Sequence, residues 1–326
     1  VFVFFNQLQT THGENQTSIT EFFLLGFGDL HNFRMFFFIM FLLIYIVAFA
    51  GNLLVILLVA THHALHSPMY FFLSQLSLSE ILFTTNIVPN LLHLILQGGA
   101  NMSVTNCMVQ FYLLCVPTIA QSLLLAAMSF DRYAAICNPL HYMSVMTFKL
   151  QLYIAAYCWA SGVLTALLAF AFLHPLVFCL ANVINHFYCD IAPIIELSCS
   201  DTSIVELVVS LDSMFVFFSP FVFIIGTYVS ILRTILRIPS GCGRQKAFST
   251  CSSHLSVVFV YYGTLTAIYL YSPGKHSLNA NKFLSLLYIV VTPLFNPIIY
   301  SLRNQDIKRA IRKCVLGKVG SCHLYI

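Results

Sequence analysis

The sequence predicts an all-α membrane protein, a bundle of seven transmembrane helices followed by a short amphipathic C-terminal helix. Of the 326 residues, 59% are hydrophobic and 8% are charged, whereas a typical soluble domain is about 25% charged. Seven stretches are apolar over the ~20 residues that a helix needs to cross the hydrocarbon layer. The basic residues gather on one side of these stretches. A soluble fold would leave too much apolar surface in water, which excludes an ordinary cytosolic enzyme, a disordered chain and a nucleic-acid-binding protein.

The seven predicted spans are residues 36–60, 69–96, 110–133, 150–172, 204–232, 249–270 and 283–302. They are continuously apolar and lack alternation with a period of two, so helices fit better than barrel strands. The connections are short, which predicts one bundle over 36–302, a tail over 1–35 and an amphipathic helix and tail over 303–326. Residues 1–5 are too short for the core of a signal peptide, so we expect the first span to act as the insertion signal.

The basic residues predict the orientation of the bundle. With the C-terminus in the cytoplasm, the outer side holds three basic residues, Arg34, Lys275 and Lys282. The inner side then holds twelve: Arg132, Lys149, Arg233, Arg237, Arg244, Lys246, Arg303, Lys308, Arg309, Arg312, Lys313 and Lys318. This is the distribution that the positive-inside rule expects. The sequon at Asn15 then lies in the outer tail, where glycosylation is expected.

Four cysteines fall on the outer side of the predicted bundle: Cys107 at the start of the third span, and Cys179, Cys189 and Cys199 in the loop before the fifth. In an oxidising compartment they predict two disulfides, one of which would pin the loop to the third span. The alternative is that some are buried free thiols. Cys115, Cys158 and Cys251 fall inside spans and are expected to be packing residues.

Polar residues inside spans mark functional positions. Glu80 lies midway along the second span, and Asn52, Asn296 and Gln121 lie at similar depth. We expect the two asparagines to be its partners, with Gln121 as a further candidate. A carboxylate among amides can hold a small cation such as sodium. The alternative is a protonated Glu80 that only donates a hydrogen bond.

Two motifs end spans at the inner face. Asp131 and Arg132, followed by Tyr133, can form a charge-assisted pair that holds a closed state, although a span can also end in a snorkelling arginine. Asn296, Pro297 and Tyr300 form Asn-Pro-x-x-Tyr in the seventh span, where the proline permits a kink. Basic residues then alternate with Ile307, Ile311 and Val315, which predicts an amphipathic helix on the anionic inner leaflet rather than a solvated tail.

These residues carry a resemblance to a family. The chain resembles the rhodopsin-like G-protein-coupled receptors, and among them the tetrapod-type olfactory receptors. The blocks that carry it are LHSPMYFFL at 65–73, MSFDRYAAICNPLHY at 128–142, KAFSTCSSHL at 246–255 and PLFNPIIYSLRN at 293–304.

The resemblance implies disulfides Cys107–Cys189 and Cys179–Cys199. It implies a multi-pass receptor of the plasma membrane with its N-terminus outside the cell. Such a receptor binds a small volatile odorant and activates a stimulatory olfactory-type G protein, which raises cyclic AMP. The residues that it assigns to the activation switch are Asp131, Arg132, Tyr133, Tyr228, His254, Asn296, Pro297 and Tyr300. Glu80 stands where Asp is usual and Gln121 where many members carry Glu, which weakens the expectation of sodium at Glu80, Asn52 and Asn296.

The expected ligand site lies between helices in the outer half of the bundle. Its candidates are Phe111, Leu114, Cys115 and Thr118 on the third span, Val209, Asp212, Ser213 and Val216 on the fifth, and Tyr262, Leu265, Thr266 and Tyr269 on the sixth. The family resemblance implies that Tyr262 is the residue that senses ligand. Tyr288 on the seventh span is a further candidate.

Asp212 suggests a ligand with an amine or hydroxyl group; the alternative is a structural hydrogen bond within the outer loop. A channel or transporter would need paired intramembrane charges, and Glu80 and Asp212 have no matching bases within the spans. Motifs typical of enzymes, such as a zinc-spaced histidine set or a nucleophile elbow, do not occur in the sequence.

Overall fold

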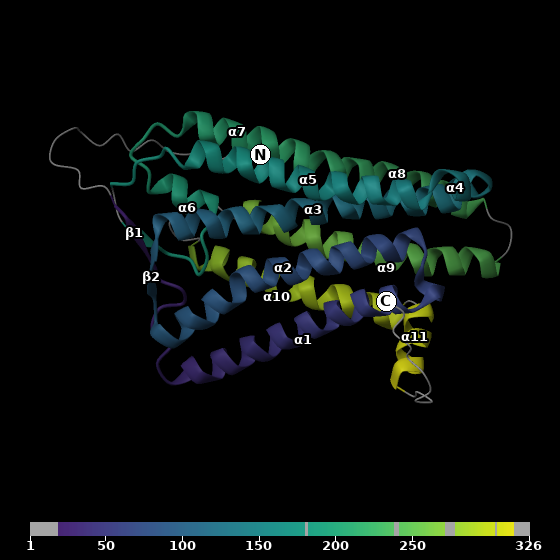
Figure 1. Ribbon diagram of the computed structural model, residues 1–326, viewed down its shortest axis with the longest axis horizontal. Helices are drawn as coiled ribbons and strands as arrows, with labels where there is room; N and C mark the ends of the chain where they lie inside the picture. The colour runs from purple at the N-terminus through teal and green to yellow at the C-terminus, as the bar shows by residue number, and fades with distance from the viewer. Residues whose placement is uncertain (1–18, 180–181, 238–240, 271–277, 304, 316–326) are drawn as a thin grey trace.

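The protein is a bundle of long helices (Figure 1). The structure, a computed structural model, describes residues 19–179, 182–237, 241–270, 278–303 and 305–315. Seven helices of the described part are long and apolar enough to cross a membrane, which confirms the predicted fold class. They are α1 (Arg34–Thr61), α2 (Pro68–Gln97), α3 (Val104–Cys137), α5 (Phe148–Leu173), the continuous run α7 (Ser203–Ser213), η3 (Met214–Phe218) and α8 (Ser219–Leu236), α9 (Gly241–Leu270) and α10 (Leu278–Arg303).

Local signals in the sequence fix several helix ends. Pro68 occupies the first turn of α2, where its missing N–H is not needed. Gly98 ends α2 with a φ of +77°, the left-handed conformation that glycine adopts without steric cost. Ser103 and Thr147 cap α3 and α5, because their hydroxyl oxygens accept from the backbone amides of Asn106 and Leu150.

Short elements connect the spans. They are the 3₁₀ turns η1 (His31–Phe33), which leads into α1, and η2 (His63–Leu65), and the helices α4 (Pro139–Val145) and α6 (Ile191–Glu196); the helix α11 (Gln305–Val315) follows the last span. In Figure 1, α6 lies at one end of the bundle, and α4 and α11 lie at the other. We refer to these as the disulfide end and the α11 end. The predicted amphipathic C-terminal helix is therefore present, with Ile307 and Ala310 buried against the bundle.

A small sheet at the disulfide end was not predicted from the sequence. Its strands β1 (Glu21–Leu24), β2 (Ala100–Ser103) and β3 (Val183–Ile184) lie in the order β2-β1-β3. β1 pairs antiparallel with β2 and parallel with β3. The sheet therefore joins the N-terminal segment to two loops that are distant in the sequence.

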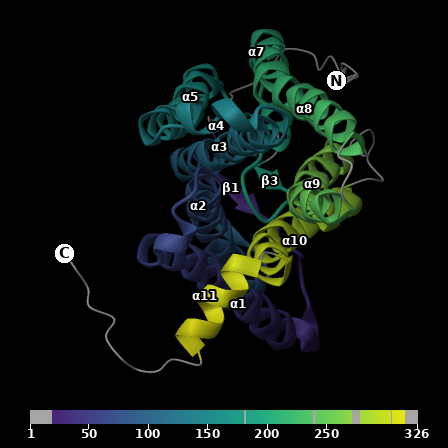
Figure 2. The same ribbon diagram turned by 90° about the vertical axis from the view of Figure 1, so that its right-hand side faces the viewer.

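The centre of the bundle is formed by α2 and α3. In their most apolar windows 56% of the residues are buried, compared with 22% in α1 and α5. Figure 2, which views the bundle from its α11 end, shows α3 beside α2 and α5. The approach of α5 to α3 is close at Gly162, where a Cβ would lie 2.6 Å from the carbonyl oxygen of Val116. The polar side chains predicted to be functional lie inside this packed interior.

Candidate functional site

The disulfide end of the bundle is covered by the sheet and by the loop between α5 and α7. Two disulfides hold this cover, Cys107–Cys189 with a Cα–Cα distance of 5.4 Å and Cys179–Cys199 with 5.9 Å. Both are the pairs that the family resemblance implies. The Oε1 of Gln110 on α3 also accepts a hydrogen bond from the Cys189 amide at 3.0 Å. Loop and helix are thus joined by covalent and polar contacts.

His186 and Lys282 tie the cover to α10. The ammonium of Lys282 is buried and donates to the carbonyl oxygen of Gly26 at 2.6 Å, which joins α10 to the N-terminal segment. His186 is buried in the loop, and its Nδ1 accepts from the Tyr188 amide. Burial lowers the pKa of His186 to about 3, and the positive charge of Lys282 acts in the same direction. The imidazole is therefore neutral at physiological pH.

Candidate ligand residues lie beneath this cover on three helices. Phe111 and Thr118 on α3 are buried, and Leu114 and Cys115 are half-buried. Across from α3, the candidates on α7 and η3 are Val209, Asp212 and Ser213, which are half-buried, and Val216, which is buried. On α9, Tyr262 and Leu265 are buried. These residues can form the predicted site between helices.

Two α9 candidates stand apart from this set. Thr266 is exposed together with Leu255, Phe259 and Gly263, which lie on the outward face of α9. The structure therefore places Thr266 away from the bundle interior, contrary to the expectation. The Tyr269 side chain lies outside the described residues.

Asp212 lies on the inner face of α7 without a compensating base. The described residues form three ion pairs, and Asp212 takes part in none of them. The alternative role, a structural hydrogen bond within the outer loop, is not found among the described residues. A second carboxylate, that of Asp190 in the loop, also acts electrostatically on the Cys115 thiol. Burial raises the pKa of Asp190, while the Ile191 amide that it accepts from lowers it. Two carboxylates, those of Asp190 and Asp212, thus lie near the Cys115 thiol, and neither forms an ion pair among the described residues.

Tyr262 belongs to a hydrogen-bonded group at the floor of the candidate site. Its hydroxyl lies 2.8 Å from the Ser122 Oγ, which also donates to the carbonyl oxygen of Val216 at 2.7 Å. Pro220 has no N–H, so the Val216 carbonyl, four residues earlier, lacks its helical partner. The chain accommodates this with the π-helical turn η3. Ser122 was not predicted, although the proline in the fifth span was a usable signal.

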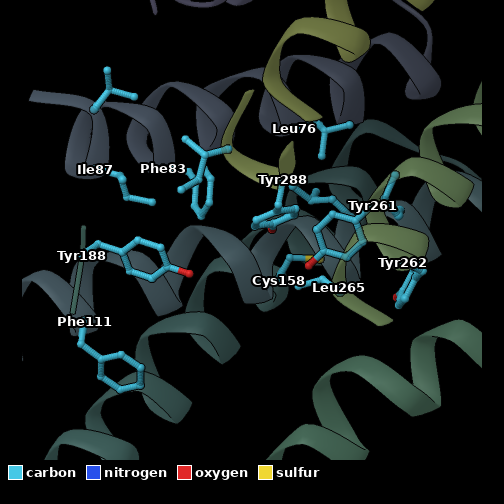
Figure 3. Packing of buried hydrophobic residues seen from close by; sticks show 14 of the residues in the cluster. Leu76, Phe83, Ile87, Phe111, Cys158, Tyr188, Tyr261, Tyr262, Leu265 and Tyr288 are labelled. Carbon is cyan, nitrogen blue, oxygen red and sulfur yellow. The ribbon is translucent and has the colours of Figure 1, made fainter. Parts of the chain in front are cut away.

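Aromatic rings extend this group across the bundle. The ring of Tyr262 lies 4.8 Å from that of Phe221 and 5.0 Å from that of Tyr261. Tyr288 of α10 continues the row at 6.2 Å from Tyr261 and 5.2 Å from Phe83 of α2. Figure 3 shows the rings of Phe83, Tyr288 and Tyr261 along the interior. This row of rings therefore connects Tyr262 to side chains on α8, α9, α10 and α2.

Below this row, Glu80 is buried among polar side chains. The Asn296 Nδ2 donates to Glu80 Oε1 at 2.6 Å, as expected. Asn52, the other expected partner, instead donates to the carbonyl oxygens of Ala48 and Pro293 at 2.9 and 3.0 Å. The reason is that Pro293 and Pro297 interrupt the backbone bonding of α10 and leave a carbonyl for α1 to bind. The buried side-chain atoms that lack a hydrogen-bond partner among the described residues include Glu80 Oε2, Asn52 Oδ1, both Gln121 polar atoms and Thr292 Oγ1.

The switch residues lie at the α11 end. The Arg132 guanidinium donates to Asp131 Oδ2, and the hydroxyl of Tyr142 on α4 donates to Asp131 Oδ1 at 2.7 Å. Burial and the Asp131 charge raise the pKa of Tyr142, so the hydroxyl keeps its proton. Both oxygens of the Asp131 carboxylate are thus occupied. This is the closed pair that the sequence suggests.

A second contact joins the fifth and sixth spans near Arg132. The hydroxyl of Tyr228 on α8 lies 2.7 Å from Nδ1 of His254 on α9. Tyr133 is half-buried beside the cluster of Ile231, Ile235 and Cys251. The Tyr300 side chain and the Asn15 sequon lie outside the described residues. The structure therefore brings together two pairs of the predicted switch set.

Comparisons with known proteins agree with this arrangement. The family model for olfactory receptors matches residues 41–318. Human olfactory receptor 10R2 is 44% identical over 325 residues, which cover 100% of this chain and 96% of that protein. Human olfactory receptor 10C1 is 45% identical, with 92% of this chain and 96% of that protein covered, and rat olfactory receptor 1f45 is 42% identical, with 94% and 98% covered. The chain therefore belongs to the olfactory receptor family, and it is a G-protein-coupled receptor and not an enzyme.

Proposed function

We propose that the chain is an odorant receptor that binds a small volatile ligand at the disulfide end and activates a stimulatory heterotrimeric G protein, raising cyclic AMP. The observation that carries the proposal is the hydrogen-bonded group in which the Ser122 hydroxyl bonds to the hydroxyl of Tyr262 and donates to the Val216 carbonyl. This group joins the three helices that hold the candidate ligand residues. It lies between those residues and the switch, so a ligand that moves Tyr262 acts on all three helices.

The proposed ligand carries an amine or a hydroxyl group. Asp212 is half-buried and has no basic partner among the described residues, and a charge-assisted hydrogen bond would stabilise its carboxylate. Apolar side chains, such as those of Phe111 and Leu114, supply most of the remaining surface. Replacing Asp212 with Asn should weaken the response to an amine or alcohol more than the response to a hydrocarbon of the same shape.

The proposed mechanism is a population shift between a closed and an open form. A ligand moves such an equilibrium only by its difference in affinity for the two forms. In the closed form Arg132 is paired with Asp131, and Tyr228 is bound to His254. Opening at the α11 end of α9 would break these contacts and free Arg132 for the G protein.

The proposed orientation has the disulfide end outside the cell and the α11 end in the cytoplasm of a plasma-membrane protein. Two disulfides at one end favour an oxidising compartment there. The excess of basic residues on the other side follows the positive-inside rule.

A bound sodium ion is a further proposal for the cluster around Glu80. The unpartnered atoms of the cluster include three side-chain oxygens, of Glu80, Asn52 and Gln121, and oxygen donors suit a hard cation. The donor set thus fits sodium, although the described residues include no group of three His, Cys, Asp or Glu side chains that could hold a metal. The alternative is a protonated Glu80 with the same Asn296 contact.

The experiment that tests the proposal starts with a screen of volatile compounds against the expressed receptor, with cyclic AMP as the readout. Arg132→Ala should then abolish the response to an active compound while surface expression persists. Lys149→Ala is the matched control, because this cation lies at the same end of the bundle over the Tyr153 ring and outside the switch. An unchanged response of Arg132→Ala would remove Arg132 from the mechanism.

A further inference from the structure

A groove lies on the outside of the bundle between α1, α10 and α11. Its volume is about 140 Å³, and all its lining residues are apolar; they include Val47, Leu54, Pro297, Ile307 and Ile311. Figure 2 shows α11 beside α1 and α10 at this end. Sites for drug-sized ligands have volumes of ~300–1,000 Å³. The groove is therefore suited to a narrow apolar chain rather than to a compact ligand.

The groove is open to the surrounding lipid. On α1, Val47 is 57% exposed and Leu54 is 43% exposed, and Ile298 on α10 is 43% exposed. Its floor is fixed by the close approach of the two helices at Gly51, where a Cβ would lie 3.1 Å from Cγ of Pro297. An acyl chain can thus enter from the bilayer without any movement of the helices.

Two basic residues of α11, Lys308 and Arg312, directly follow the groove-lining residues Ile307 and Ile311. On α11, Ile307 and Ala310 are buried and Ile311 lines the groove, while Lys308 is half-buried and Arg312 is exposed. Lys308 and Arg312 are four residues apart, so they lie on the same side of the helix. Neither takes part in an ion pair among the described residues. Two cations beside an apolar groove are complementary to an anionic lipid.

We propose that this groove binds one acyl chain of an anionic glycerophospholipid, whose phosphate contacts Lys308 and Arg312. The proposed orientation places α11 at the cytoplasmic leaflet, which holds the anionic lipids. A basic residue near such a surface strengthens binding about fivefold, so the pair should contribute roughly 25-fold. The lipid would join α11 to α1 and α10, next to Pro297 of the switch set.

The test uses the full chain, purified into nanodiscs of phosphatidylcholine that contain a few per cent of phosphatidylserine with a diazirine in one acyl chain. After illumination, labelled peptides are quantified by mass spectrometry. Label should concentrate on the groove-lining peptides of α1, α10 and α11. Phosphatidylcholine with the same diazirine should label them much less.

Two variants separate the headgroup from the chain. Lys308→Gln with Arg312→Gln should reduce the groove label by about an order of magnitude or more, and Leu54→Trp should reduce it by filling the groove. The matched control is Arg233→Gln with Arg237→Gln, which removes two exposed cations at the C-terminal end of α8, away from the groove. It should leave the label unchanged.

Several results would overturn the proposal. They are label spread evenly over the lipid-facing helices, equal label from phosphatidylcholine, or an equal loss in the Lys308/Arg312 and Arg233/Arg237 variants. A thermal melt of each variant shows whether it is folded. If Leu54→Trp is unfolded, the surface substitutions on α11 decide the matter alone.

Discussion

The close approach of α5 to α3 at Gly162 makes a sharp prediction about stability. Gly162→Ala adds a Cβ that would lie 2.6 Å from the Val116 carbonyl oxygen, and that atom belongs to the backbone of α3. The helices must therefore move apart. Overpacking of a close-packed core costs typically 1–3 kcal/mol, while alanine gains roughly 0.5–1 kcal/mol over glycine in a helix. The net effect should be a loss of up to about 2.5 kcal/mol.

Gly226 and Gly263 are the matched controls, because a Cβ at either position meets no atom within 4 Å. Alanine at these positions should be neutral or stabilising, since the gain in helix propensity has nothing to offset it. The assay is thermal unfolding of the purified receptor with a thiol-reactive fluorophore, which reports exposure of the buried thiols of Cys158 and Cys251. A Gly162→Ala melting temperature equal to or above that of Gly226→Ala would refute this account of the α3–α5 contact.

Three further predictions concern the cover and the Glu80 cluster. The pKa of His186 is about 6.5 in the unfolded chain and about 3 in the folded protein. The folded protein therefore binds fewer protons, and its stability should fall as the pH drops below 6.5, by up to ~1.4 kcal/mol per pH unit. The same dependence of melting temperature on pH in His186→Asn would contradict this. Removing the Cys107–Cys189 disulfide, whose cysteines are 82 residues apart, should lower stability more than removing Cys179–Cys199, whose cysteines are 20 residues apart. The chain-entropy model gives losses of about 4.5 and about 3 kcal/mol. The reverse order of melting temperatures in the two double Cys→Ser variants would count against that model here. Replacing choline with sodium as the buffer cation should raise the melting temperature of the receptor, and Glu80→Gln should remove this difference. The same melting temperature of the parent receptor in the two buffers would leave Glu80 as a protonated hydrogen-bond donor.

Hydrophobicity made the bundle predictable, because lipid requires long apolar helices whatever their packing. The sheet at the disulfide end was not predictable in this way. Its strands are two to four residues long and pair across large sequence separations, so no local pattern marks them.

Spacing along a helix did not by itself separate the buried from the exposed candidates. Tyr262 and Thr266 are one turn apart, yet Tyr262 is buried and Thr266 is exposed. Depth along the spans predicted the contact of Glu80 with Asn296. It could not predict that Asn52 binds the Pro293 carbonyl, because that depends on how α10 is bent by its prolines.

The central claim is that an odorant acts through the closed pair at Arg132 to activate a stimulatory G protein. The most direct measurement is cyclic AMP in cells that lack endogenous G-protein α subunits and are supplied with either a stimulatory or an inhibitory one. An odorant from the screen should raise cyclic AMP only with the stimulatory subunit, and only when Arg132 is present. A rise without that subunit, or a full response from Arg132→Ala, would contradict the account.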